Sequence, residues 1–252
     1  MNALSTDRFR TFLSGIGERF ADLLFPRTCV SCGAPDTFYC EACLSAVPRR
    51  LTYDCPVCKN VRTPYGETCV LCAKRSSLDG VFSPAVFREH HSLAEAIHAL
   101  KYEFVPDLAV PLGTLLASRA QDTDLSIPDL VIPVPLHPWR LRYRGFNQSA
   151  LIAESFAVSF LPDLPLPVRQ DILVRTRFTM PQAKSRGAKE RRENLKNAFA
   201  LHPKNPDAKK ELKGGVVWLV DDVATTGATL AECAKVLKKS GARKVFGIVV
   251  AQ

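Results

Sequence analysis

Eight of the nine cysteines form four Cys-x-x-Cys pairs between residues 29 and 72. The pairs are Cys29 with Cys32, Cys40 with Cys43, Cys55 with Cys58, and Cys69 with Cys72. Four thiolates complete the tetrahedral shell that zinc prefers, and each pair supplies two of them from one tight turn. Disulfides would need an oxidising compartment, and the N-terminus lacks the uninterrupted apolar core of a signal peptide. The spacing therefore predicts two structural zinc sites. Sequential pairing is the simplest arrangement, and interleaved pairing stays open.

A second group of residues follows the apolar run Val216–Val220, which predicts a buried strand. Asp221 and Asp222 come directly after it, and a loop of small and hydroxyl-bearing residues leads into a helical pattern. Unpaired N–H groups at a helix start suit a phosphate, and carboxylates accept hydrogen bonds from sugar hydroxyls. We therefore expect a sugar-phosphate site here, with Asp221 and Asp222 as catalytic candidates. The phosphate-binding candidates are Ala224, Thr225, Thr226, Gly227, Ala228 and Thr229.

Arginines occur at every second position after a proline-rich turn, at Arg140, Arg142 and Arg144. In an extended segment these side chains would share one face. Guanidinium forks suit phosphate or pyrophosphate oxygens, although a solvated basic loop is the alternative. The substrate-binding candidates are Arg140, Arg144 and Gln148. The interleaved aromatic rings can stack on bases, so the candidate nucleic-acid contacts are Trp139, Arg142 and Tyr143.

Residues 169–196 carry nine basic side chains against three acidic ones. Their polar centre predicts a long flap. Such a flap would close over a substrate in a transferase, or lie along the backbone of a nucleic acid. Arg186, Arg191 and Arg192 are the further nucleic-acid candidates.

Strands and helices alternate along the part of the chain that must position these residues. Strand-like apolar runs occur at Val81–Phe87, Leu130–Pro135, Ile172–Val174, Val216–Val220 and Val245–Val250. Helical patterns occur at Ser92–Glu103, Asn147–Phe160 and Thr229–Ser240. This order predicts a mostly parallel α/β sheet with flanking helices, and ligands at the carboxyl ends of its strands. The expected organisation is an amphipathic helix within 1–26, a cysteine-rich double zinc ribbon at 27–75 and the α/β domain at 78–252.

The composition is that of an ordinary globular protein, with 46% hydrophobic and 23% charged residues among 252. It excludes a disordered or collagen-like chain. The formal charge is +9, and zinc binding by eight thiolates would lower it by about four, which still favours an anionic partner. The sequence contains no run of about 18 apolar residues, so we expect no membrane span and a cytoplasmic location.

Several motifs occur in one order behind the cysteine pairs. They are Pro133–Pro138, Arg144–Gln148, Arg175–Gln182 and Asp221–Thr229. The last resembles the ribose-5-phosphate loop of type I phosphoribosyltransferases, apart from a smaller residue at Ala224, and the whole order resembles the ComF family. The resemblance implies a phosphoribosyltransferase-like domain that binds phosphoribosyl pyrophosphate with Mg²⁺. It also implies a role in competence and DNA uptake, with single-stranded DNA and a competence helicase or DNA-processing proteins as partners.

Two functions from different classes follow. The first is a phosphoribosyltransferase, a glycosyltransferase-type enzyme whose acceptor the sequence does not identify. Asp221 and Asp222 would hold the ribose as positive charge develops on it, and the arginines with Mg²⁺ would stabilise the departing pyrophosphate. The second is a non-catalytic module that holds single-stranded DNA on a reused transferase fold. The intact acidic pair and threonine loop favour a bound sugar-phosphate ligand and leave turnover open.

Overall fold

The computed structural model describes residues 27–164, 166–178 and 193–252. The helix expected within 1–26 lies outside the described residues, as do Arg186, Arg191 and Arg192 of the expected flap. None of the described helices is long and apolar enough to cross a membrane.

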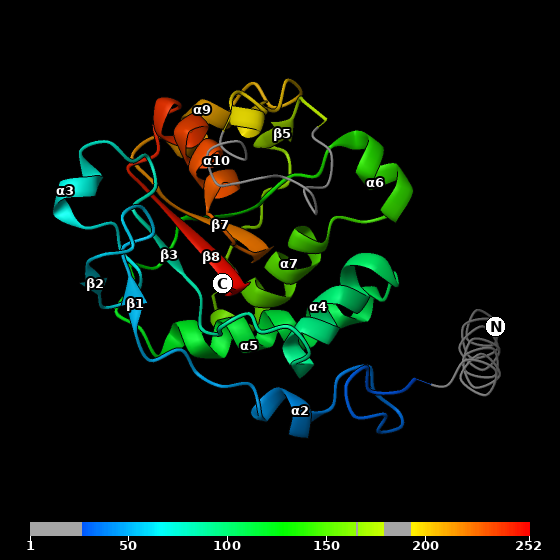
Figure 1. The fold of residues 1–252 in the computed structure, drawn as a ribbon. Helices are drawn as coiled ribbons and strands as arrows, with labels where there is room; N and C mark the ends of the chain where they lie inside the picture. Colours follow the sequence, from blue (N-terminus) through cyan, green and yellow to red (C-terminus); the bar gives the residue numbers. More distant parts are fainter. Residues whose placement is uncertain (1–26, 165, 179–192) are drawn as a thin grey trace, which may run out of the picture.

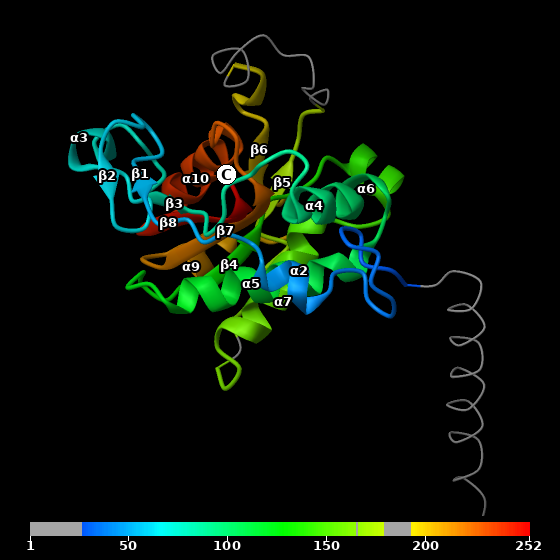
Figure 2. The same ribbon diagram turned by 60° about the horizontal axis from the view of Figure 1, so that its bottom comes forward.

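Four parallel strands form the central sheet in the order β3-β8-β7-β4 (Figures 1 and 2). Their bounds are Gly80–Phe82 for β3, Leu130–Pro133 for β4, Val216–Val223 for β7 and Lys244–Ala251 for β8. The two central strands are apolar on both faces, as expected for a parallel sheet covered on both sides. The expected α/β fold class with a parallel sheet is confirmed.

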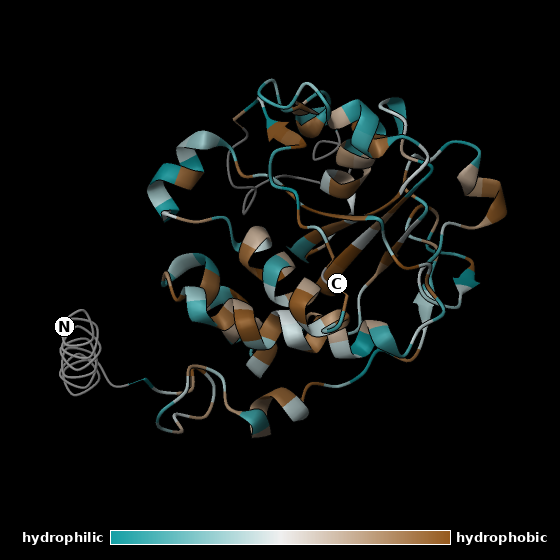
Figure 3. Ribbon diagram, turned by 180° about the vertical axis from the view of Figure 1, so that it is seen from behind, coloured by the Kyte–Doolittle hydropathy of each residue, from teal (hydrophilic) through white to brown (hydrophobic). Residues whose placement is uncertain are grey.

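Helices cover both faces of this sheet (Figure 2). One face packs against α4 (Ser92–Tyr102), α5 (Ala109–Gln121) and α7 (Gln148–Phe160), and η1 (Pro106–Leu108) leads into α5. The other face packs against α9 (Ala208–Leu212) and α10 (Ala228–Lys239). Figure 3 shows hydrophobic residues concentrated in the strands and in the helices beside them. Trp218 of β7 is fully buried and packs against Phe156 and Phe160 of α7, with ring centroids 5.8 and 5.2 Å away.

Two of the expected strands differ from the prediction. The run Val81–Phe87 forms a strand only to Phe82, because Pro84 has no N–H to continue the ladder, and pairing resumes as a single bridge at Ala85. The run near residue 173 forms β5 (Leu173–Arg175), which lies outside the parallel sheet and pairs antiparallel with β6 (Phe199–Leu201). The apolar pattern indicates a strand but does not specify its partner.

The arginine segment is a helix, α6 (Pro138–Arg144), and not an extended chain. Proline suits the first helical position because its φ is already helical. The ring of His137 accepts a hydrogen bond from the N–H of Trp139 at 3.2 Å, and Gly145 ends the helix in a left-handed conformation with φ of 81°. The expectation that Arg140, Arg142 and Arg144 share one face is therefore wrong. Helical periodicity puts Arg140 and Arg144 together and turns Arg142 away.

The cysteine-rich segment contains four short elements and packs on the α/β part. They are α2 (Glu41–Ser45), β1 (Tyr53–Asp54), β2 (Arg62–Thr63) and α3 (Val70–Ala73). The hydroxyl of Tyr39 donates to Ser92 Oγ at 3.0 Å, at the start of α4. The ring of Tyr53 stacks on Phe82 of β3 with centroids 5.6 Å apart. Both cysteine groups are thus anchored to the domain that carries the sheet.

Candidate functional site

The structure gathers the eight cysteines into two groups of four. One group is Cys29, Cys32, Cys40 and Cys43, and the other is Cys55, Cys58, Cys69 and Cys72. Within each group the sulfur atoms all lie within 4.8 Å of one another. A tetrahedral zinc with bonds of about 2.3 Å places its sulfurs about 3.8 Å apart. The Cys32 and Cys40 sulfurs are 3.6 Å apart, and those of Cys58 and Cys69 are 3.9 Å apart. Both groups fit zinc, and the pairing is sequential.

The first cysteine of each group accepts backbone hydrogen bonds on its sulfur. The N–H of Cys40 donates to Cys29 Sγ at 3.4 Å, and the N–H of Cys69 donates to Cys55 Sγ at 3.4 Å. Burial alone would raise these pKa values. The backbone N–H groups outweigh burial and lower the pKa of Cys29 and of Cys55 to about 6. The fold thus favours a thiolate, which is the metal-binding form, at the same position of both groups.

The acidic pair lies near the carboxyl end of β7, where neighbouring residues point to opposite faces of the sheet. Asp221 Oδ1 accepts a hydrogen bond from Ser149 Oγ at 2.7 Å. Asp222 is buried and its Oδ1 lies 2.9 Å from Lys101 Nζ on α4. Its second oxygen, Oδ2, is also buried but accepts no hydrogen bond from any residue that the structure describes. A carboxylate oxygen in this state has room for a donor or a cation from a ligand.

The surroundings of Asp221 raise its pKa. Burial and the adjacent charge of Asp222 raise the pKa of Asp221 to about 7, although Ser149 and Lys101 oppose the rise. Burial would lower the pKa of Lys101, but the charge of Asp222 outweighs it and raises that pKa. Lys101 therefore stays charged where it meets Asp222. A carboxyl group whose pKa is raised to about 7, next to a second carboxyl group, is an arrangement that active sites use.

The loop after β7 turns sharply into α10. Gly227 has φ of 70°, a conformation that side chains other than glycine rarely adopt. Thr226 Oγ1 accepts a hydrogen bond from the N–H of Ala228 at 3.4 Å, and the N–H of Ala224 donates to the carbonyl of Ala251 at 3.2 Å. Ala224 is buried beneath the loop and Thr225 is exposed. The start of a twelve-residue helix thus lies directly beyond the acidic pair.

A cavity of about 440 Å³, the β7 cavity, opens at the carboxyl ends of β4 and β7. The sequence-predicted residues that line it are Arg140, Arg144, Gln148, Asp221, Asp222, Thr225 and Thr229. Thr226, Gly227 and Ala228 line a neighbouring cavity of about 480 Å³ beside the second cysteine group. Arg142 is not among the described residues that line the β7 cavity. The structure therefore brings the acidic pair, two of the three arginines and part of the threonine loop together.

Sequence reasoning missed four polar residues that line this cavity, namely Lys101, Tyr102, Ser149 and Arg175. Lys101 and Tyr102 are the last two residues of α4. A lysine at the C-terminal end of a helix is common at the surface and does not by itself indicate a site. Ser149 lies in the first turn of α7, whose cap Asn147 accepts from the N–H of Ser149 at 3.2 Å. Arg175 opens a motif noted in the sequence, and this was the one available signal.

Exposed aromatic rings form a row beside the β7 cavity. Trp139 and Tyr143 stack on one face of α6 with centroids 5.8 Å apart and an interplanar angle of 3°. Phe104 meets Tyr143 edge-on at 5.9 Å, and Phe178 meets Trp139 edge-on at 5.3 Å. The exposed fractions are 57% for Trp139 and 71% for Tyr143. We call these four rings the aromatic row.

Comparison with known proteins identifies relatives of this chain. A scan of protein-family models gives no match. The chain is 34% identical to Competence protein F of Haemophilus influenzae over 194 residues, which cover 76% of this chain and 81% of that protein. It is 30% identical to DNA utilization protein YhgH of Salmonella typhi over 233 residues, which cover 88% and 96%. The solved glutamine phosphoribosylpyrophosphate amidotransferase of B. subtilis matches 57% of this chain and 26% of its own length, with 17% identity and a TM-score of 0.36.

The fold and the site define an α/β protein whose parallel sheet carries an acidic pair at the end of a central strand, beside two four-cysteine groups that suit zinc. The chain belongs to the family of Competence protein F, the ComF family. The resemblance that the motif order indicates is thus confirmed.

Proposed function

We propose that this protein binds phosphoribosyl pyrophosphate with Mg²⁺ in the β7 cavity. The observation that carries the proposal is the buried Oδ2 atom of Asp222, which lacks a partner among the described residues. Asp222 lines a cavity that is also lined by three arginines, Arg140, Arg144 and Arg175, and by Thr225 and Thr229 of the threonine loop. A sugar hydroxyl would donate a hydrogen bond to this oxygen. The arginines and the threonine loop would bind the two phosphorylated ends of the sugar separately.

Each part of the ligand has matching residues. Asp221 and Asp222 would accept hydrogen bonds from the ribose hydroxyls. The loop Ala224 to Thr229 would hold the 5′-phosphate at the start of α10, where helix N–H groups favour an anion. Arg140 and Arg144 would bind the pyrophosphate oxygens through their guanidinium forks. Mg²⁺, when bound with the ligand, would neutralise part of the pyrophosphate charge.

We further propose that the cavity supports transfer of the ribose 5-phosphate group to a nucleophile. The two carboxylates would face the ribose and stabilise the positive charge that develops on it. The two arginines on α6 would stabilise pyrophosphate as it leaves. The two four-cysteine groups would hold structural zinc and position the segment that anchors α4. Metal-bound thiolates of this kind favour a reducing, cytoplasmic location.

The proposal is tested by titrating the zinc-loaded chain with the ligand and with its halves. Calorimetry should show binding of phosphoribosyl pyrophosphate that requires Mg²⁺. Ribose 5-phosphate and pyrophosphate should each bind at least about tenfold more weakly, because each would occupy only part of the cavity. Equal affinity for pyrophosphate alone would show that the arginines bind any polyphosphate and would contradict the sugar site.

A second candidate function is binding of single-stranded DNA, and the aromatic row favours it. Stacked, exposed rings beside arginines form the usual platform for unpaired bases. The names of the relatives, competence and DNA utilization, support a DNA-handling role with DNA-processing partners. DNA binding and a ligand in the β7 cavity are compatible, since the row lies outside the cavity.

Salt dependence separates the contributions to DNA binding. Changing Trp139 or Tyr143 to Ala should weaken binding of an oligothymidylate by about 1–3 kcal/mol without changing the salt slope. Changing Arg142 to Ala should instead flatten the slope by about 0.7, the value for one phosphate contact on a single strand. Failure to bind the oligonucleotide at low salt would eliminate this second function.

A further inference from the structure

The two cysteine groups present different side chains at the positions between their paired cysteines. In the first group Val30 packs against the buried cluster of the α/β part, and Glu41 is exposed. In the second group three large aliphatic side chains reach the surface at these positions. The exposed fractions are 38% for Val57, 80% for Val70 and 73% for Leu71. The second group therefore turns apolar side chains to solvent where the first group does not.

These three aliphatic side chains lie close together, because the cysteines beside them converge. Val57 precedes Cys58 and Val70 follows Cys69, and the sulfurs of these two cysteines are 3.9 Å apart. A single exposed aliphatic side chain is ordinary, but a group of them indicates a surface that binds another molecule. Turns held by a metal would lose little conformational freedom on binding. We call Val57, Val70 and Leu71 the knuckle patch.

The cavity of about 480 Å³ between the second cysteine group and α10 adjoins the knuckle patch. We call it the α10 cavity. Val57 belongs to the patch and also lines this cavity, whose apolar wall includes Pro56 and Leu78. The patch and the cavity are therefore continuous, and one bound molecule can contact both.

Basic side chains determine the charge of the α10 cavity. Arg75, Lys235 and Lys239 line it, against one acidic residue, Glu232, among the described lining residues. Lys235 Nζ lies 3.9 Å from Glu232 Oε1, whereas Arg75 and Lys239 form no ion pair with any residue that the structure describes. The other exposed basic side chains of the second group are Lys59, Arg62 and Lys74. Cations beside an apolar wall favour an occupant that carries both carboxylates and aliphatic side chains.

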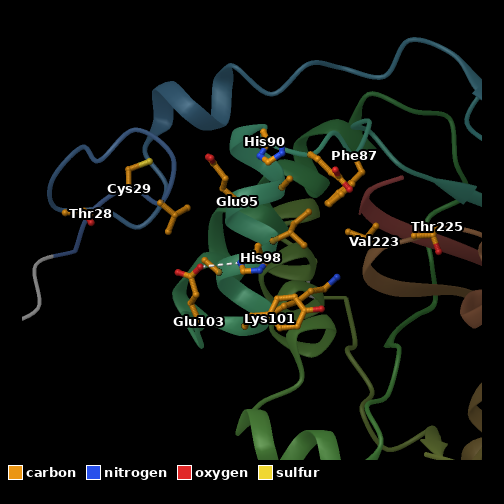
Figure 4. Close-up of a pocket in the computed structure, with 16 residues that line it drawn as sticks. Thr28, Cys29, Phe87, His90, Glu95, His98, Lys101, Glu103, Val223 and Thr225 are labelled. Carbon is orange, nitrogen blue, oxygen red and sulfur yellow. Dashed lines mark hydrogen bonds and ion pairs between the residues drawn. The ribbon is translucent and has the colours of Figure 1, made fainter. Parts of the chain in front are cut away.

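The first cysteine group borders a cavity of the opposite charge (Figure 4). This cavity, of about 830 Å³, lies between α4 and the first group, and we call it the α4 cavity. Three acidic residues line it, Glu89, Glu95 and Glu103. Figure 4 shows Glu95 and Glu103 projecting from α4 on the side of Cys29. An acidic molecule would be repelled there and attracted to the α10 cavity, so the two groups suit different partners.

We propose that the knuckle patch and the α10 cavity together form a docking surface for an acidic segment of a partner protein. Aliphatic side chains of the segment would pack on Val70 and Leu71. Carboxylates beside them would enter the α10 cavity and pair with Arg75 and Lys239. This inference goes beyond the proposed function and needs no ligand in the β7 cavity.

The side chains of this surface favour a protein over single-stranded DNA. Unpaired bases stack on aromatic rings, whereas the exposed side chains of the knuckle patch are aliphatic. The aromatic row, which suits bases, includes Trp139 and Tyr143 of α6, and Figures 1 and 2 show α6 and α3 on opposite sides of the molecule. A DNA backbone would pair with the cations but would leave the aliphatic side chains without an apolar partner.

A docked segment would also contact the threonine loop. Thr226, Gly227 and Ala228 line the α10 cavity, whereas Thr225 and Thr229 line the β7 cavity. Binding should therefore protect the backbone amides of residues 226–228 from hydrogen exchange, together with those of residues 70–77. This footprint identifies the surface independently of any substitution.

The test selects binders of the zinc-loaded full chain from a display library of random short peptides. Fluorescence polarisation then measures their binding to the wild type, to Leu71→Asp and to Lys239→Glu. The matched controls are Val158→Asp on α7, where the side chain is 72% exposed, and Lys210→Glu on α9, both outside the α10 cavity. Zinc content is measured for every variant. Lys239 lies outside the cysteine segment, so its variant tests the surface even if Leu71→Asp loses zinc.

We expect the selected peptides to carry Asp or Glu next to Leu, Ile or Val, and to give the footprint described above. Leu71→Asp and Lys239→Glu should each weaken them at least about tenfold, and the two controls less than about twofold. The inference is overturned if selection yields no binder, yields basic peptides, or yields peptides that neither variant weakens. Equal weakening of oligothymidylate and peptide binding by the two variants would also overturn it, because the surface would then be a DNA site.

Discussion

Asp222 is the residue on which the electrostatics of the site depend. One of its oxygens is paired with Lys101, and the other is reserved, in our account, for the ligand. An isolated buried carboxylate costs several kcal/mol, so the ion pair makes the ligand-free site tolerable.

Replacing Lys101 by Met should destabilise the fold by about 3 kcal/mol, because it leaves Asp222 buried without its cation. The double variant Lys101→Met with Asp222→Asn should recover most of that loss, since no charge then remains unpaired. Urea unfolding of the four proteins in a double-mutant cycle measures the coupling. Purely additive losses would show that the two side chains do not stabilise each other.

The pKa of Asp221 predicts how stability depends on pH. Its folded pKa of about 7 lies above the ordinary value, so the folded state binds the proton more tightly and stability falls as pH rises from about 4 to about 7. Asp221→Asn removes this effect. The variant should match the wild type near pH ~4 and exceed its unfolding free energy by about 4 kcal/mol above pH ~7, since the pKa is raised by about three units. A constant difference across this range, measured by urea unfolding, would contradict the raised pKa.

At the residue scale, the sequence identifies side chains that stand out by their type and spacing. Asp221, Asp222 and the eight cysteines lie in compact local patterns. In the structure the two aspartates line one cavity, and the cysteines form two groups of four. Lys101 and Ser149 belong to helices far away along the chain. Their contacts with the acidic pair arise only from packing, which no local pattern encodes.

Helix α6 shows how an element decides what its residues can do. Pro138 begins the helix and Gly145 ends it, so the three arginines are distributed by a helical period and not by strand alternation. Arg140 and Arg144 line the β7 cavity as a result. The alternating spacing of the arginines favours an extended segment, but the proline and glycine at its two ends outweigh that pattern.

This geometry predicts unequal roles for the three arginines. Arg140→Ala and Arg144→Ala should each weaken binding of phosphoribosyl pyrophosphate at least about tenfold, the range expected for a charged hydrogen bond to a phosphate. Arg142→Ala should change it less than about twofold and serves as the matched control. Calorimetry with Mg²⁺ present measures all three. An effect of Arg142→Ala as large as the others would mean that the three side chains act together from one face.

The main sheet could be predicted from the sequence because its strands are apolar runs separated by helical patterns. β7 and β8 extend beyond their predicted ends, since pairing in the centre of the sheet continues as far as both backbones allow. The pairing of β5 with β6 could not be predicted from the sequence, because three residues on each strand are too few to specify a partner. Leu173 of β5 and Phe199 of β6 belong to the same buried cluster as the apolar face of α10.

At the scale of the whole molecule, the two four-cysteine groups are fastened to the α/β part. Cys29 and Tyr39 belong to the same buried cluster as α4, α5 and α7. The two groups attach at different places, beside α2 and beside α3, in both views of the ribbon (Figures 1 and 2). Zinc would therefore stabilise the wall of the α4 cavity as well as the segment itself.

Metal analysis should find two zinc ions per chain. A strong chelator should remove them and expose residues 27–75 to hydrogen exchange before the sheet, because the segment has few apolar residues to hold it together without metal. Protection of α4 should fall next, since the first cysteine group packs on its start through Tyr39. One zinc per chain, or simultaneous loss of protection throughout, would contradict two separate structural sites.

The most direct test of the central claim is calorimetric titration of phosphoribosyl pyrophosphate with Mg²⁺ into the wild type and into the double variant Asp221→Asn with Asp222→Asn. The account predicts one site per wild-type chain. In the double variant, affinity should fall at least about a hundredfold, because an amide replaces each of the two carboxyl groups that would accept hydrogen bonds from the ribose hydroxyls. Zinc content and hydrogen exchange should stay unchanged and report an intact fold. Wild-type affinity in a folded double variant would contradict a sugar site at the end of β7.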